Sequence, residues 1–207
     1  MTERRLPSSA HTGHPWLIHT IAEDFALEDV WALRAPGGGS GDFPVLSAFA
    51  SGGLEQQVSA PARALFWLRE KSGALLRLDR EGRGLGGRVT SLRERLPDDL
   101  RAAAEAHRQD TDSSPLTFLY EVADERAMEL ANRTVHAVAH FGWVPDGEGG
   151  WRGQLAILVK PNGRFGAAYM AFIKPFRHLI VYPAMLRAWE RAWRSRPLDE
   201  TRRLDKG

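Results

Sequence analysis

The chain contains no cysteine among its 207 residues. A disulfide framework, a thiolate zinc site and a cysteine nucleophile are therefore excluded. It also lacks an excess of one charge, because 28 basic residues stand against 26 acidic ones, a formal net charge of +2. Nucleic-acid binders usually concentrate basic side chains on one face, whereas the arginines here are interleaved with acidic residues. Nucleic acid is therefore not an expected partner.

An uninterrupted apolar segment is also missing. The longest candidate, residues 167–188, is broken by four basic side chains and two prolines. Each Lys or Arg costs about 2.5–3.5 kcal/mol at the centre of a bilayer, so we expect no membrane span here. The first 14 residues have no apolar core of the kind that a secretory signal needs, and we therefore expect a cytoplasmic protein.

Several catalytic motifs are absent as well. There is no nucleophile elbow, no phosphate-binding loop and no H-E-x-x-H pair. Residues 82–87 match G-x-G-x-x-G, but a predicted helix precedes them and a charged loop surrounds them, so we interpret them as a flexible loop. We expect no cofactor and no metal site, and the sequence identifies no catalytic residue.

What is present is enough sequence for one domain with a proper core. Residues 1–14 and 197–207 are polar and are predicted to be flexible tails, which leaves residues 15–196 as a single domain. Residues 79–114 are charged and Gly-rich, and we interpret them as a variable insertion. In the first half the patterns predict a candidate strand with imperfect alternation, two helices and two short helical turns, at residues 25–33, 43–51, 61–78, 91–96 and 98–107.

The second half predicts a run of antiparallel strands joined by turn residues. The four segments are Leu116–Ala123, Arg126–Asn132, Thr134–Val144 and Trp151–Lys160. The third has the clearest period of two, which points Val135, Ala137, Ala139, Phe141 and Trp143 one way and His136, Val138 and His140 the other.

A long helix is predicted from about Arg164 to Arg194, with kinks at Pro175 and Pro183. It is apolar around most of its circumference in its first part, which is typical of a buried helix, and becomes amphipathic after Pro183. Early helices, a meander of strands and a long terminal helix together predict an α+β fold.

The residues of Gly163–Ala188, GRFGAAYMAFIKPFRHLIVYPAMLRA, resemble the terminal helix of a bacterial family of unknown function. That family lies within the START-like, or helix-grip (SRPBCC, polyketide cyclase and lipid transport), superfamily and has the pattern G-R-x-x-Y-x-x-x-I-x-P-F-H-R-L-I-V. Two further segments carry the resemblance, SAPARALFWLREKSGALLRL and the strand VHAVAHF, where the family tends to read H-L-D-F-R. The chain departs from the pattern at Phe176-Arg177-His178, where the family reads Phe-His-Arg, and at Val138 and His140, where it often has Asp and Arg.

The resemblance covers about residues 25–194 and implies a curved antiparallel sheet wrapped around a long C-terminal helix, with an apolar cavity between them. Our first hypothesis is a module that binds a hydrophobic small molecule, such as a lipid or polyketide-like compound, in that cavity. The candidate ligand-binding residues are His136, His140, Trp143, Tyr169, Phe172, Phe176, Arg177 and His178.

Two alternatives stay open beside that hypothesis. The first is an enzyme of the cyclase or hydratase type that uses His136 or His140 as acid or base. The second is a protein-interaction module without a cavity, which docks a partner or an anionic surface through Trp189, Trp193 and nearby arginines. The sequence also leaves open whether the protein is a homodimer, and for Arg177 and His178 whether they meet a ligand or pair with the 79–114 insertion.

Overall fold

The structure, a computed structural model, describes residues 4–52, 89–107, 116–131 and 135–196. The predicted helix at residues 61–78 and the G-x-G-x-x-G segment at 82–87 lie outside the described residues, as does the predicted tail at 197–207. Within the last helix the side chains of Arg164, Phe165 and Tyr169 are also outside the description.

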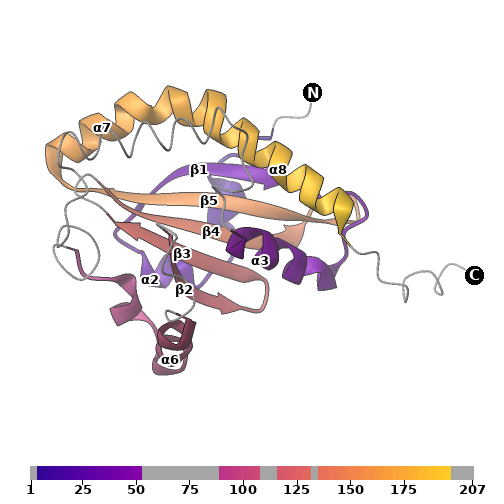
Figure 1. Ribbon diagram of the computed structural model, residues 1–207, viewed down its shortest axis with the longest axis horizontal. Coiled ribbons are helices and arrows are strands. Elements are labelled where there is room, and N and C mark those ends of the chain that lie inside the picture. Colours follow the sequence, from indigo (N-terminus) through magenta and orange to yellow (C-terminus); the bar gives the residue numbers. More distant parts are fainter. Residues whose placement is uncertain (1–3, 53–88, 108–115, 132–134, 197–207) are drawn as a thin grey trace, which may run out of the picture.

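Five antiparallel strands form one curved sheet in the order β1-β5-β4-β3-β2 (Figure 1). The strands are β1 (Ala26–Leu33), β2 (Thr117–Val122), β3 (Glu125–Ala131), β4 (Val135–Pro145) and β5 (Trp151–Pro161). The four successive strands predicted in the second half are confirmed as the meander β2 to β5. The candidate strand of the first half is confirmed as β1, which pairs with β5 and so lies at one edge.

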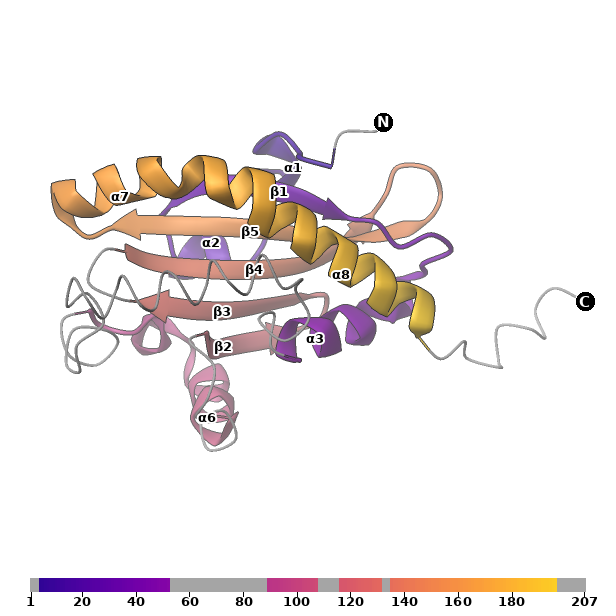
Figure 2. The ribbon, with the colours of Figure 1, turned by 45° about the horizontal axis from the view of Figure 1, so that its top comes forward.

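Short helices lie before and between the strands, and one long rod ends the described chain. The short ones are α1 (Ser9–Thr12), α2 (Ile18–Ile21), η1 (Ser40–Asp42), α3 (Phe43–Ser51), η2 (Leu92–Arg95) and α6 (Asp98–His107). The rod consists of α7 (Gly163–Phe176), the π-helical turn η4 (Arg177–Val181) and α8 (Tyr182–Ser195). It crosses one side of the sheet and bends near its middle (Figures 1 and 2). The predicted α+β helix-grip arrangement is confirmed.

The bend coincides with the two prolines that the sequence analysis singled out. Pro175 lies one residue before the end of α7, and Pro183 is in the first turn of α8. A proline has no backbone N–H and its ring crowds the preceding turn, so regular i to i−4 bonding is interrupted around each. Between them the amide of Tyr182 donates to the carbonyl of Arg177, the five-residue step of a π-helix.

Strand alternation gives the sheet two buried faces with different coverings. On β4, Ala139, Phe141 and Trp143 join the cluster that packs against α8, and we call this side the helix face. Val138 and Val144 join the cluster that packs against the N-terminal segment, η2 and α6, and we call this side the N-terminal face. The two-sided pattern predicted for this strand is confirmed.

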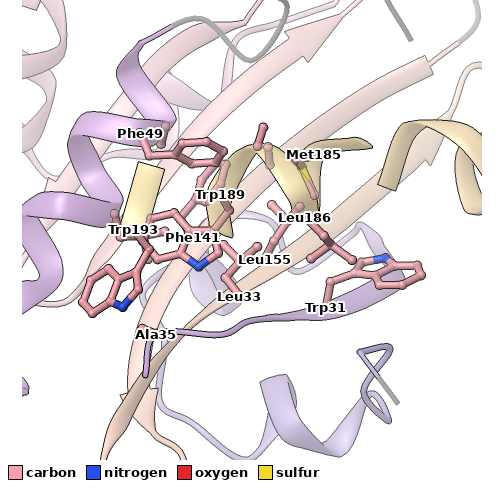
Figure 3. Packing of buried hydrophobic residues seen from close by; sticks show 14 of the residues in the cluster. Trp31, Leu33, Ala35, Phe49, Phe141, Leu155, Met185, Leu186, Trp189 and Trp193 are labelled. Carbon is pink, nitrogen blue, oxygen red and sulfur yellow. The ribbon is translucent and has the colours of Figure 1, made fainter. Parts of the chain in front are cut away.

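The core on the helix face is built around two tryptophans of α8 (Figure 3). Trp189 packs edge-on against Phe49 of α3 with ring centroids 5.2 Å apart, and Trp193 lies 5.7 Å from Trp143. The indole N–H groups of Trp189 and Trp193 donate to backbone carbonyls of Arg34 and Pro36. Both side chains are buried, so the proposed docking face made of these tryptophans is wrong: they are core residues whose polar atoms are already satisfied.

Two further expectations differ from the structure. The outer side chains of α7 and η4 are open to solvent, with Phe172 of α7 69% and Leu179 of η4 77% exposed, although an all-round apolar helix predicted burial. Residues 4–14, expected to be a polar tail, pack on the sheet: Arg5 bridges to Trp31, and His11 is 1% exposed. No helix in the described part of the chain has both the length and the apolarity to cross a bilayer.

Candidate functional site

A bulge in β1 puts a carboxylate where the strand pattern predicts an apolar residue. The pairing with β5 shifts between Leu27 and Asp29, so Glu28 is the extra residue. Because a bulge reverses the alternation, Leu27 packs on the N-terminal face, while Asp29 lies opposite Ile157 on the helix face. The side chain of Asp29 is fully buried there.

Three side chains of the rod meet this carboxylate. Arg177 donates from Nη2 to Asp29 Oδ2, and the Tyr182 hydroxyl donates to the same oxygen at 2.8 Å. Nε2 of His178 lies 3.0 Å from the other oxygen, Oδ1. Arg5 approaches Oδ1 from the N-terminal segment at 3.5 Å. A buried carboxylate needs such partners, because an unpaired buried charge is strongly unfavourable.

The π-helical turn explains how one helix can present these side chains together. In an α-helix, with about 3.6 residues per turn, positions five apart point in well-separated directions. In η4 the fifth residue completes the turn, so Arg177 and Tyr182 lie one above the other and both reach Asp29. Single π turns recur at functional sites in proteins, which makes this turn informative.

Trp31 completes what we call the Asp29 cluster: Asp29, Trp31, Arg177, His178 and Tyr182. The Trp31 ring lies 4.7 Å from that of Tyr182 and 5.8 Å from that of His178, centroid to centroid. Two buried N–H groups of the cluster, Trp31 Nε1 and Arg177 Nε, have no hydrogen-bond partner among the described residues. Asp29 Oδ1 and His178 Nε2 lie 3.0 Å apart as an ion pair, without the geometry of a hydrogen bond. Buried polar atoms are normally satisfied, so the two N–H groups point to a polar contact that the described residues do not supply.

The charges of the cluster are set by their surroundings. Burial alone would lower the pKa of Arg177, but Tyr182 and Asp29 outweigh it and the pKa is raised, so the guanidinium stays charged. Burial raises the pKa of Tyr182; Arg177 opposes this and Asp29 adds to it, so the phenol keeps its proton. The cluster therefore offers a compensated ion pair, a phenol that is a hydrogen-bond donor, and an imidazole beside a carboxylate.

The sheet separates the candidate ligand residues that the sequence had grouped. Arg177 and His178, on the side of the rod that faces the sheet, pair with Asp29 of β1 and with no residue of the described part of the insertion, 89–107. Trp143 is on the same face but deep in the α8 core, and its indole donates to the carbonyl of Gly39 at 2.9 Å. Phe172 and Phe176 contact each other on the exposed side of the rod. The side chain of Tyr169 lies outside the described residues.

His136 and His140 lie on the N-terminal face, so they do not share a site with the Asp29 cluster. Nε2 of His136 lies 2.6 Å from Oε1 of Glu129, and its ring packs edge-on against Phe25. Glu129 also accepts from the amide of Leu92 and the hydroxyl of Ser91, which attaches η2 to the sheet. His136 therefore belongs to a satisfied structural contact, and His140, described below, has both ring nitrogens engaged. Within the described ranges no three His, Cys, Asp or Glu side chains gather in a way that could hold a metal ion.

Sequence reasoning missed Asp29 and Trp31 as site residues. One signal for Asp29 was available, because two adjacent acids, Glu28 and Asp29, interrupt the apolar run FALEDVWAL, and an acid buried there needs a cation from elsewhere in the chain. Its partner Arg177 lies 148 positions away, so no local spacing connects the two.

Comparison with known proteins gives a family and no function. Neither the curated proteins nor the solved structures contain a match to this chain. The family model described as "Protein of unknown function (DUF2867)" matches residues 21–184. This range includes all five residues of the Asp29 cluster. The chain belongs to this family, DUF2867, whose function is unknown.

Proposed function

We propose that the protein binds an apolar small molecule between the helix face of the sheet and the α7 half of the rod, with the Asp29 cluster as its polar anchor. The observation that carries the proposal is the pair of buried N–H groups, beside aromatic rings, that have no partner among the described residues. Binding sites for small molecules are typically apolar, with a few convergent polar groups that fix the orientation of the ligand. The cluster has this composition.

The charges of the cluster favour a neutral oxygen over an anion as the recognised group. Arg177 is already compensated by Asp29, so a carboxylate or phosphate would compete with a buried anion. A hydroxyl or ketone oxygen can accept a hydrogen bond from the N–H group of Trp31 or of Arg177, neither of which has a partner among the described residues. The ligand class is therefore an apolar body with a hydroxyl or carbonyl group, which includes many lipid and polyketide-like compounds.

Ligand extraction and two matched tryptophan variants test the proposal. Protein purified in native buffer is analysed by native mass spectrometry, and its organic extract is re-added to ligand-free protein. Trp31→Phe removes an N–H without a partner, whereas Trp189→Phe removes an N–H that donates to Arg34. We expect Trp31→Phe to weaken binding about tenfold, the equivalent of one hydrogen bond of about 1.4 kcal/mol, and Trp189→Phe to leave affinity unchanged while lowering stability. Equal affinity in all three proteins, or a chain that retains no apolar compound, would contradict it.

An acid–base enzyme is the second candidate, and one observation favours it. His178 lies beside Asp29, as in sites where a carboxylate orients an imidazole that transfers protons. On this reading the imidazole is His178 and not His136 or His140, since those two rings are fixed by carboxylates on the other face. The test is whether the wild type converts the extracted compound. If His178→Asn still binds the compound but no longer converts it, the protein is an enzyme and not only a binding module.

Kinship of the family with the START-like superfamily is also part of the proposal. It is supported by the order of elements, with a strand and helices first, then a meander of strands and a terminal helix across the sheet (Figure 1). An experimental structure with its ligand under the rod, in the place where START-like proteins bind theirs, is the expected outcome, and a ligand on the N-terminal face would argue against it.

A further inference from the structure

A chain of three histidines ends at a buried glutamate on the N-terminal face. Nε2 of His19 lies 3.0 Å from Nδ1 of His11, and Nε2 of His11 lies 3.1 Å from Nδ1 of His140. Nε2 of His140 then lies 2.7 Å from Oε2 of Glu125. His11 and His19 come from the N-terminal segment, whereas His140 and Glu125 come from the sheet. The chain of contacts therefore spans the boundary between the two.

The segment that this chain holds, residues 7–21, is named here the N-terminal cap. Its other contacts with the sheet are the apolar packing of Trp16, Ile18 and Ile21 and a few hydrogen bonds. The amide of Gln154 donates to the carbonyl of Ala10 at 3.1 Å, and the backbone amide of Leu17 donates to Glu125. Trp16 lies over Gly142 of β4 so closely that a Cβ there would be 2.8 Å from the indole ring. Apart from the Leu17 amide, which donates to the same Glu125, the histidine chain is the one attachment among these contacts that depends on titratable side chains.

Proton counting shows how many protons the chain of contacts can hold. Ionised Glu125 only accepts, so His140 donates through Nε2; each ring then donates through Nε2 and accepts through Nδ1, with His19 Nδ1 at the outer end. One extra proton on any ring still leaves every contact with one donor and one acceptor, provided that each ring farther from Glu125 moves its proton from Nε2 to Nδ1. A second extra proton puts two N–H groups face to face at an N···N contact, which breaks it.

The surroundings oppose that second proton. His11 is buried, and its pKa is lowered to about 3 by burial first and then by the positive charge of His140, His19 and His14. Burial and His140 also lower the pKa of His19, against the opposing effect of Glu125. On the sheet side, the Tyr120 hydroxyl donates to Glu125 Oε2 at 3.1 Å and, as a neutral donor, adds no charge. No acidic side chain other than Glu125 contacts the three rings in the described structure.

We propose that the His19–His11–His140–Glu125 chain is an acid-sensitive latch that holds the N-terminal cap on the sheet at neutral pH and loosens it as the pH falls. A ring released with the cap is free to take up a proton that the closed chain refuses, so acid favours the open state. From His11 alone, with an ordinary value of 6.5 and a latched value of about 3, the opening equilibrium rises about thirtyfold between neutral pH and pH 5.

Amide hydrogen exchange of the full chain at pH 7.5 and pH 5, corrected for the chemical exchange rate, tests the latch. We expect protection of the cap peptides to fall about thirtyfold at pH 5 and to stay well below that of the β4 and β5 peptides at both pH values, because the cap opens without unfolding the sheet. His11→Gln keeps a donor and an acceptor but cannot be protonated, so the pH effect should largely disappear. The matched control is His136→Gln, a buried histidine on the same face that pairs with Glu129 and has no contact with the chain of rings; it should behave as the wild type.

Equal protection of the cap at both pH values would overturn the latch, and so would a full pH effect in His11→Gln. Cap peptides with the same protection as the β4 and β5 peptides would also overturn it, because the cap would then open only by global unfolding. If His11→Gln does not fold, His19→Gln removes only the outermost ring and must reduce the pH effect for the proposal to stand.

Discussion

Replacing Asp29 by leucine should destabilise the protein far more than a surface aspartate replaced in the same way. The Asp29 side chain is 0% exposed and that of its partner Arg177 is 13% exposed, so the variant leaves a nearly buried cation without its counter-ion. Breaking such a pair by removing one partner costs about 3–5 kcal/mol. Asp24 is the matched control, because its side chain is 35% exposed and pairs with Arg95 and Lys160 at the surface. Exposed pairs contribute about 0–1 kcal/mol.

A double variant separates the charge from the shape. Asp29→Leu with Arg177→Met removes both charges and leaves two apolar side chains of comparable size, an exchange that is often neutral in buried pairs. The double variant should therefore be more stable than Asp29→Leu alone. Urea unfolding followed by circular dichroism gives the free energies, with unchanged m values as the check that the unfolded states are comparable. The single variant Arg177→Met completes the comparison. If the effects of Asp29→Leu and Arg177→Met simply add in the double variant, or if Asp29→Leu costs no more than Asp24→Leu, the pairing argument and the polar anchor built on it are refuted.

Three further predictions follow from other parts of the fold. Trp189→Ala should cost about 3–5 kcal/mol, and Phe172→Ala, on the exposed side of the rod, about 0.5 kcal/mol or less in the same urea titration. The unfolding free energy should fall by about 2 kcal/mol from pH 7.5 to pH 5 and fall much less in His11→Gln. The pKa of folded His11 is below its unfolded value, so this stability is present above about pH 6.5 and is lost as the unfolded state takes up the proton. Gly142→Ala should displace Trp16 and speed amide exchange of the N-terminal cap at every pH, because the new Cβ lies 2.8 Å from the ring.

The strands could be predicted because their signals are local. In β4 every second residue from Val135 to Trp143 is apolar, His136 and His140 lie between them, and the turn residues Pro145-Asp146-Gly147 follow the segment. The same reasoning described β1 incompletely. Its alternation looked imperfect because the extra residue Glu28 reverses the faces, and a bulge has no reliable local pattern.

The parts that the sequence could not give depend on contacts between distant residues. His11 lies in a short polar segment whose composition predicts a tail, yet it contacts His140, 129 positions away. Aromatic spacing on the rod predicted burial for Phe172, although the sheet reaches only the opposite side of α7, where Met170 packs against Val135 and Val159. The composition of a segment and the spacing of its apolar residues indicate which of its faces can be buried. Which other segment covers that face depends on the rest of the fold.

The π-helical turn divides the rod into two halves with unequal attachment to the sheet. Beyond it, α8 is fixed by buried side chains from Tyr182 to Trp193, including two indoles that donate to backbone carbonyls. Before it, α7 buries Met170 against a small cluster and exposes its other aromatic side. Lifting α7 therefore exposes less apolar surface than lifting α8, and that surface is the main free-energy cost of opening a buried site. A ligand that enters beneath the rod should come in under α7, with η4 as the fixed point. On the proposed function that route ends at the Asp29 cluster, where the N–H groups of Trp31 and Arg177 have no partner among the described residues.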